Sequence, residues 1–139
     1  MKKFLCVLLL VLGTTVAFAL EVEASIVISN VQPKTGTLFV VIYNSAESMK
    51  KKQSFKTLKL ETKSETITAN VTLPAGEYFL SAYQDINNNG KFDTNFLGFP
   101  KEPIGIANFS GKTMPGGFDK HKVFINAENL EVLIAMITI

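Results

Sequence analysis

Apolar and polar residues alternate at every second position along much of the chain beyond residue 20, and this pattern predicts β-strands. Residues 65–73 show it most clearly, because four apolar side chains there alternate with threonine and asparagine. Successive side chains of a strand point to opposite faces, so the apolar set lies on one face of a sheet. Turn residues separate several such segments. Strands are expected at residues 24–31, 37–43, 56–61, 65–73, 77–84, 122–126 and 130–139.

Helical spacing of apolar residues is not a feature of this part of the sequence, and only a short helical turn is expected, near residues 47–52. About seven short strands in a domain of this size are typical of an antiparallel β-sandwich of the immunoglobulin-like or transthyretin-like type. We therefore expect an all-β fold in which residues 20–139 form one domain. A closed barrel is the alternative architecture.

Residues 94–119 interrupt the strand pattern and are rich in glycine, proline, asparagine and phenylalanine. An irregular loop of this length is uncommon in a compact domain unless it has a function or is disordered. Several large apolar side chains argue against disorder, because disordered linkers carry few of them. We expect this long loop to fold back over the edge of a sheet or the open end of the core. Its large apolar residues include Phe96, Phe99, Ile104, Ile106, Phe109 and Phe118.

The first 19 residues have the features of a secretory signal peptide. Lys2 and Lys3 precede an apolar run at residues 4–12, and Ala-Phe-Ala at 17–19 matches the small-residue pattern of a cleavage site. The apolar run is shorter than the roughly 20 residues that span a bilayer. We expect cleavage after residue 19, no transmembrane segment in the remaining chain, and a location in the bacterial periplasm or outside the cell.

Charge and cysteine content narrow the classes of partner. Loss of Lys2 and Lys3 leaves 12 basic and 12 acidic residues, and every basic residue is lysine. Nucleic-acid-binding proteins rely on arginine forks and strongly basic surfaces, so no nucleic-acid partner is expected. Cys6, the only cysteine, lies within the predicted signal peptide. The exported domain therefore has no disulfide and depends on its core, alone or together with a metal ion.

The segment that carries the clearest chemistry is 85–93, which directly follows a predicted strand. Oxygen-bearing side chains stand at its first, third and fifth positions, glycine at the sixth and a carboxylate at the ninth. Calcium binds about six to eight oxygens at roughly 2.3–2.6 Å, and this alternation turns several oxygens toward one point. The predicted ligands are the side chains of Asp85, Asn87, Asn89 and Asp93 and the backbone carbonyl of Lys91.

The sequence leaves two interpretations of this segment open. The first is a calcium loop with a weak affinity of about 10⁻⁴–10⁻³ M, because it has only two certain carboxylates. The twelfth position, a glutamate in helical calcium loops, is Phe96 here, so Glu102, Asp119 or water would have to complete the shell. The second is a plain turn, in which Asp and Asn side chains bond to nearby backbone groups and Gly90 takes the left-handed conformation.

A catalytic function is not expected. His121 is the only histidine, and without cysteine in the exported domain it cannot form a zinc site from the usual histidine and cysteine ligands. A general base would need an orienting carboxylate and a nucleophile, and no sequence motif for such a group surrounds His121. We expect His121 to be an exposed residue of a strand.

Several segments together resemble a known family. They are Leu-Pro-Ala-Gly-Glu-Tyr at 73–78, the 85–93 segment, and Asn-Phe-Leu-Gly-Phe-Pro-Lys-Glu at 95–102, with Pro115 and Phe118 following in order. In these features the chain is similar to the exported bacterial proteins of domain of unknown function 2141. The resemblance implies an exported single-domain β-sandwich, and it supplies no biochemical activity.

The expected function is therefore that of an exported, non-enzymatic structural or binding module of the cell envelope, with calcium as its ion and a protein or glycan of the envelope as its partner. The alternative is a carrier of a small apolar or glycan ligand held beneath the 94–119 loop. A carrier needs a continuous apolar cavity. Its expected lining residues are Phe96, Phe99, Ile106, Phe109 and Phe118.

Overall fold

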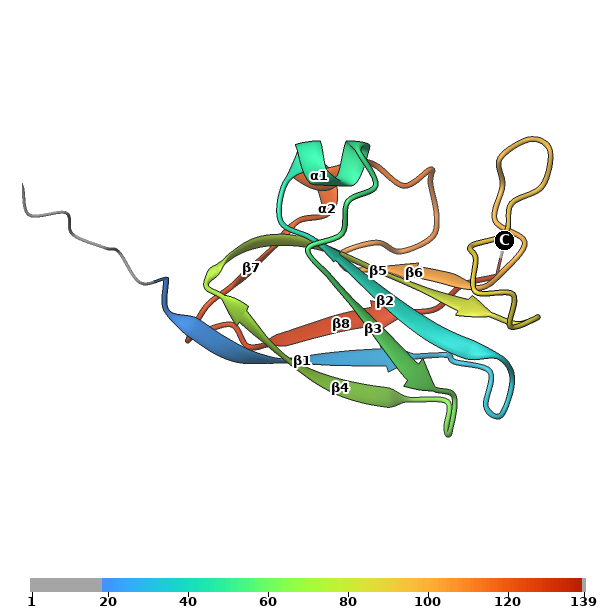
Figure 1. Ribbon diagram of the computed structural model, residues 1–139, viewed down its shortest axis with the longest axis horizontal. Helices are drawn as coiled ribbons and strands as arrows, with labels where there is room; N and C mark the ends of the chain where they lie inside the picture. Colours follow the sequence, from blue (N-terminus) through green and yellow to red (C-terminus); the bar gives the residue numbers. More distant parts are fainter. Residues whose placement is uncertain (1–18, 139) are drawn as a thin grey trace, which may run out of the picture.

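Two β-sheets packed face to face form the body of the molecule (Figure 1). The computed structural model describes residues 19–138, so the predicted signal peptide lies outside the described residues except for Ala19. The elements in chain order are β1 (Glu21–Ser29), β2 (Thr37–Tyr43), α1 (Ala46–Lys50), β3 (Lys56–Glu61), β4 (Ile67–Pro74), β5 (Gly76–Asp85), β6 (Ile104–Ile106), α2 (Phe118–His121), β7 (Val123–Ile125) and β8 (Glu131–Ala135). One sheet has the order β4-β1-β8, and the other has the order β3-β2-β5-β6 with β7 also paired to β5. The predicted all-β sandwich is confirmed.

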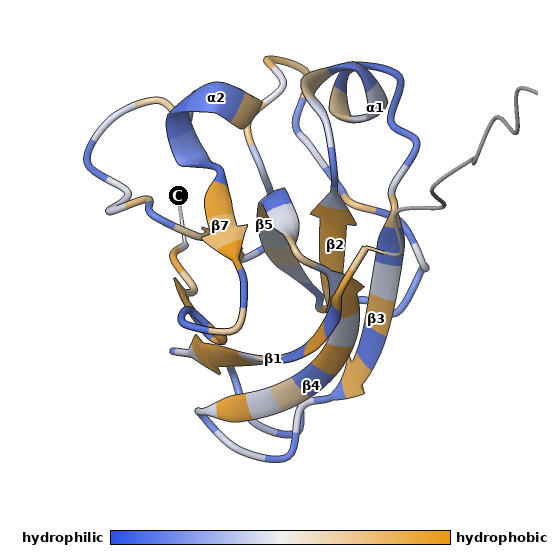
Figure 2. Ribbon diagram, turned by 90° about the vertical axis from the view of Figure 1, so that its left-hand side faces the viewer, coloured by the Kyte–Doolittle hydropathy of each residue, from blue (hydrophilic) through white to orange (hydrophobic). Residues whose placement is uncertain are grey.

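Alternating burial along the strands builds the core between the sheets, as the sequence pattern predicts. Strands β3 and β4 carry alternating hydrophobic and hydrophilic residues, whereas β2 and β7 are mainly hydrophobic (Figure 2). Strands β2 and β3 begin and end at the predicted residues. Burial of apolar surface contributes about 25 cal/mol per Å² to folding. The fully buried side chains of the core include Ile26, Ile28, Leu38, Val40, Ile42, Leu73, Leu80, Ile125 and Ile134.

Strand β8 is the exception to the antiparallel arrangement, because it pairs with β1 in parallel. The register places Ser25 opposite Glu131 and Ser29 opposite Ala135. Parallel neighbours cannot be joined by a tight hairpin and need a long connection. Here almost the whole chain, including the second sheet, lies between the two strands.

The segment 94–119 is irregular over most of its length, as predicted, but it also contains β6 and the first residues of α2. Strand β6 adds to the edge of β5, with Ser81 opposite Ile106 and Tyr83 opposite Ile104. Only glycine fits at position 105 so close to β8, because a Cβ there would lie only 2.5 Å from a methyl carbon of Ile134. The return of this segment therefore extends the sheet and closes one end of the core.

The two helices are short. Helix α1 lies near the predicted turn, and Ser45 begins it by accepting a hydrogen bond from the backbone N–H of Ser48 at 3.1 Å. Within residues 19–138, no helix is long and apolar enough to cross a membrane.

A buried polar contact fixes the end of β5. The side chain of Gln84 is fully buried; its oxygen accepts from the N–H of Gln32, and its nitrogen donates to the carbonyls of Gln32 and Thr35. Gly36 lies directly against the backbone of Asp85. Its φ is +60°, and a Cβ there would lie 2.0 Å from the carbonyl oxygen of Asp85. The loop before β2 is thus held tightly against the last residue of β5.

We expect Gly36→Ala to destabilise the protein by about 1–3 kcal/mol from backbone strain, and further because the new methyl group overlaps the Asp85 carbonyl. Gly98→Ala is the matched control, because Gly98 also has a positive φ, of +83°, but a Cβ there meets nothing within 4 Å. Urea unfolding measures both variants. Equal losses of stability would show that the close approach at Asp85 has no energetic effect.

Candidate metal-binding loop

The 85–93 segment leaves the end of β5 and curls back on itself. Two of its residues, Asn88 and Gly90, have positive φ angles of 55° and 75°. Asparagine and glycine adopt this conformation more readily than other residues, so the sequence suits the observed curl. The hydroxyl of Thr37 in β2 donates to the side-chain oxygen of Asn88 at 2.8 Å. The loop is therefore attached to the neighbouring strand as well as to β5.

Asp85 forms the buried base of the loop. Only 1% of its surface is exposed. One carboxylate oxygen accepts from the N–H of Asn89 at 3.1 Å, and the other accepts from the N–H of Gly90 at 2.7 Å. A carboxylate that is buried needs such donors, because burial without a partner is strongly unfavourable.

Asn87, Asn89 and Asp93 meet at the open side of the loop. The side-chain nitrogens of Asn87 and Asn89 both lie 2.8 Å from the same oxygen, Oδ2 of Asp93. Their amide oxygens accept instead from the backbone, Asn87 from the N–H of Asn89 at 3.0 Å and Asn89 from the N–H of Lys91 at 2.8 Å. The side chain of Lys91 is exposed. Hydrogen bonds of the Asx-turn type thus hold this conformation.

Glu102 returns to the loop from a separate segment. A small hairpin at residues 94–100 reverses the chain, and the N–H of Lys101 donates to the carbonyl of Asp93 at 2.9 Å. The two carboxylate oxygens of Glu102 then accept from the N–H groups of Ile86, at 3.1 Å, and Asp93, at 3.2 Å. Glu102 therefore joins the two ends of the loop. It was one of the two residues that the sequence offered to complete a calcium shell.

Asp119, the other residue offered, lies elsewhere. Its side chain is 83% exposed on α2 and is 3.6 Å from the ammonium group of Lys122. It does not take part in the 85–93 loop.

Three carboxylates, those of Asp85, Asp93 and Glu102, consequently share one corner of the molecule. Burial raises the pKa of the Glu102 carboxyl above its usual range, and the charges of Asp85 and Asp93 raise it further, while the hydrogen bonds from Asp93 and Ile86 oppose the shift. Within residues 19–138, no three histidine, cysteine, aspartate or glutamate side chains are grouped so that they could hold a metal ion by themselves. Any cation here would need further oxygens, such as the predicted ligands from the asparagine side chains and the backbone carbonyl of Lys91.

His121 is buried rather than exposed on a strand, so that prediction is wrong. Only 4% of its surface is exposed at the end of α2. Its Nε2 accepts from the N–H of Gly116 at 3.1 Å, and its Nδ1 lies 3.0 Å from the carbonyl of Asn108. The ring also contacts Phe109 edge to face. Because both ring nitrogens bond to backbone, His121 ties down the loop between Asn108 and Gly116.

The residues expected to line a carrier cavity do not all come together, and those that do are packed against one another. Phe96 is 94% exposed and Phe99 is 41% exposed on the 94–100 hairpin. Ile106 and Phe118 pack instead against Phe79, with Phe109 at the edge of the same cluster. The carrier alternative therefore gains no support from these side chains.

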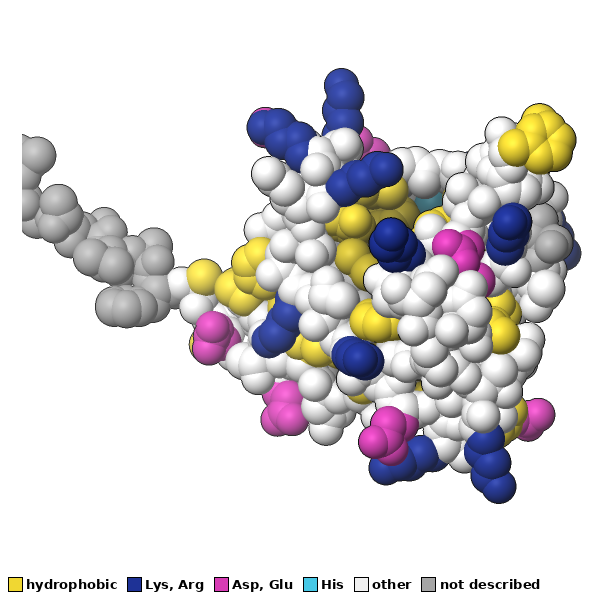
Figure 3. Space-filling view, turned by 45° about the vertical axis from the view of Figure 1, so that its right-hand side comes forward, with side chains coloured by type: hydrophobic (Ala, Val, Ile, Leu, Met, Phe, Trp, Pro, Cys, Tyr) yellow, Lys and Arg dark blue, Asp and Glu magenta, His cyan; other side chains and the backbone are white. Residues whose placement is uncertain are grey.

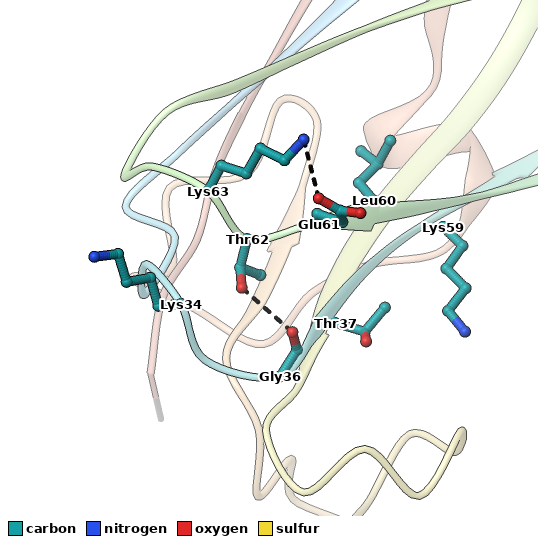
Figure 4. Close-up of a pocket in the computed structure, with 8 residues that line it drawn as sticks. All are labelled: Lys34, Gly36, Thr37, Lys59, Leu60, Glu61, Thr62 and Lys63. Carbon is teal, nitrogen blue, oxygen red and sulfur yellow. Dashed lines mark hydrogen bonds and ion pairs between the residues drawn. The ribbon is translucent and has the colours of Figure 1, made fainter.

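A hollow of about 590 Å³ lies next to the start of β2 and the end of β3 (Figure 4). Lys63 is paired with Glu61 at 3.0 Å, and the hydroxyl of Thr62 donates to the carbonyl of Gly36 at 3.3 Å. The ammonium groups of Lys34, Lys59 and Lys63 point away from one another (Figure 4). They do not converge on one point, so the hollow lacks the arrangement of an anion-binding site.

The fold and the loop together define a class of protein, a small β-sandwich with an Asp/Asn-rich loop at the end of a central strand. The chain belongs to the family described as uncharacterized protein conserved in bacteria (DUF2141), whose family model matches residues 26–132. The match includes both the 85–93 loop and Glu102. No curated protein and no solved structure matches the chain.

We expect Glu102→Ala to destabilise the protein by about 1–3 kcal/mol, because the substitution leaves the N–H groups of Ile86 and Asp93 without their acceptors. Glu131→Ala, on the exposed face of β8, is the control and is expected to change stability by no more than about 0.5 kcal/mol. Chemical unfolding in a chelating buffer measures both. A Glu102→Ala variant as stable as the control would show that Glu102 does not hold the loop.

Proposed function

We propose that the protein is an exported, non-enzymatic β-sandwich of the cell envelope that binds one calcium ion in the 85–93 loop, and that it acts there as a structural or binding module. The observation that carries the proposal is the meeting of Asp93 with Asn87 and Asn89 above a buried Asp85, with Glu102 joining the loop ends. The signal-like residues 1–19 support export. No residue of the loop has the arrangement of a nucleophile and base that a hydrolase needs.

The type of side chain favours a hard cation. Carboxylate and amide oxygens are the ligands that calcium prefers, and calcium tolerates irregular and partly hydrated shells better than magnesium does. Burial is the largest cause of the raised pKa of Glu102, and the negative charges of Asp85 and Asp93 add to it, because the three carboxylates repel one another. A divalent cation among them would offset this repulsion, so electrostatics and ligand type agree.

Binding would require a local change at the two asparagines. Their nitrogens, not their oxygens, face Asp93, so each amide has to rotate about its last side-chain bond to present oxygen to the ion. Rotation breaks the hydrogen bonds that these oxygens accept from the N–H groups of Asn89 and Lys91. This loss is a physical reason to expect a weak affinity, about 10⁻⁴–10⁻³ M.

Calcium should raise the melting temperature. An ion that binds only the folded protein stabilises it by RT ln(1 + [L]/Kd), which is roughly 1.4 kcal/mol at ten times Kd and corresponds to a Tm increase of a few degrees. Magnesium at the same concentration should give a smaller increase, because it demands a rigid octahedral shell. Thermal unfolding at increasing calcium measures the effect.

Asp93→Asn should abolish the calcium response while leaving the calcium-free Tm nearly unchanged, because it removes one charge and keeps the size of the side chain. Asp119→Asn is the matched control, since Asp119 is an exposed aspartate outside the loop. An identical calcium response in the wild type and both variants would contradict the proposed site, and so would a wild-type Tm that calcium does not change.

A further inference from the structure

The hairpin at residues 94–100 exposes large apolar side chains at its tip. Phe96 is 94% exposed, more than any other large hydrophobic side chain in residues 19–138, and its neighbour Leu97 is 65% exposed. The hairpin stands off from the sandwich (Figure 1), and hydrophobic side chains lie at the outer edge of the molecule in Figure 3. Adjacent exposed apolar groups on a soluble domain commonly mark an interaction site.

The hairpin is a regular structure that holds these side chains outward. Thr94 and Pro100 form a bridge, and the N–H of Asn95 donates to the carbonyl of Phe99 at 2.8 Å. The side-chain oxygen of Asn95 accepts from the N–H of Leu97 at 2.9 Å and of Phe99 at 3.0 Å. Gly98, with a φ of +83°, completes the turn. The exposure of Phe96 therefore results from a well-bonded turn.

Around the base of the hairpin, lysines are more exposed than carboxylates. Lys91 and Lys101, on the two sides of its base, are exposed. The nearest carboxylates are turned inward: Glu102 is buried against two backbone N–H groups, and Asp93 is half-buried and bonded to Asn87 and Asn89. Toward solvent, this end of the molecule consequently presents an apolar tip with two exposed lysines near its base, and its nearest carboxylates are less exposed than these lysines.

We propose that the 94–100 hairpin inserts Phe96 and Leu97 into the interface of a lipid bilayer that contains anionic headgroups. A projecting apolar tip fits a soft surface that closes around it, and aromatic side chains favour the level of the headgroups. Lys91 and Lys101 would then lie beside anionic phosphates, where each lysine adds to the attraction. The inference depends on the proposed export only for access to an envelope membrane, and it is independent of calcium.

Sedimentation with lipid vesicles tests the proposal in a chelating buffer, so that failure of the calcium site does not affect the result. The purified protein should bind phosphatidylcholine vesicles that contain phosphatidylglycerol more strongly than vesicles of phosphatidylcholine alone. Phe96→Ala should lower the partition coefficient by about 10- to 100-fold, the effect of leaving one aromatic side chain out of the apolar phase. Phe124→Ala is the matched control, because Phe124 is 53% exposed on β7, away from the hairpin. All forms are compared with the same N-terminus, since residues 4–12 are themselves apolar.

A fluorescence measurement locates the contact. The chain contains no tryptophan, so Phe96→Trp introduces a single indole reporter at the tip. Its emission should shift to shorter wavelength when anionic vesicles are added, whereas the emission of Phe124→Trp should not. Lys101→Glu should weaken binding to anionic vesicles about fivefold or more, because one positive charge near the lipid surface is lost. Lys63→Glu is the control and should have less effect, because Lys63 is 79% exposed on another loop.

Two results together would overturn the proposal: vesicles leave the emission of Phe96→Trp unchanged, and wild type and Phe96→Ala sediment equally. The tip would then be expected to enter a groove of a partner protein. Equal binding to neutral and anionic vesicles would contradict the role given to the lysines. The two proposals can also fail separately. If the indole of Phe96→Trp enters the bilayer but calcium does not change the Tm, membrane insertion of the hairpin is supported and the calcium site is rejected.

Discussion

Two buried carboxylates at one end of the sandwich determine how the loops of that end are arranged. Asp85 and Glu102 are 1% and 4% exposed, and every oxygen of the two groups accepts a backbone N–H of the segment between Ile86 and Asp93. A buried charge without donors would be strongly unfavourable, so the loop has to wrap around these groups. The same wrapping fixes the base of the 94–100 hairpin, beside which Lys91 and Lys101 are exposed and Asp93 is half-buried. Residues 19–138 contain no cysteine, so no disulfide holds this end together in their place.

The parts of the fold that follow from local pattern were predictable. Strands β2 and β3 have the predicted bounds, because alternation and turn residues are properties of neighbouring positions. The spacing of Asp85, Asn87, Asn89 and Asp93 predicts that their oxygens turn toward one point. The side chains of Asn87, Asn89 and Asp93 do meet, but the asparagines turn their nitrogens, not their oxygens, toward Asp93. Sequence spacing within nine residues is enough for this, since a left-handed glycine and asparagine produce the curl.

The parts that depend on distant segments were not predictable from the pattern. The role of Glu102 depends on a hairpin that returns it to Ile86, 16 positions earlier in the chain. The parallel pairing of β8 with β1, and the short strand β6, result from packing of the closed domain. The burial of His121 could not be predicted, because its ring is enclosed by Asn108, Phe109 and Gly116, which the fold of the loop brings to it.

Calcium binding by the loop is the central claim, and a nuclear magnetic resonance titration of backbone amides tests it most directly. If calcium enters the loop, the amide signals of Asn89, Gly90, Lys91 and Asp93 will move together and saturate with a single Kd of about 10⁻⁴–10⁻³ M. These are the groups whose hydrogen bonds to Asp85, Asn87, Asn89 and Glu102 change when an ion replaces them. Signals that stay in place at millimolar calcium, or that move equally near exposed acids such as Glu61 and Glu128, would contradict the claim.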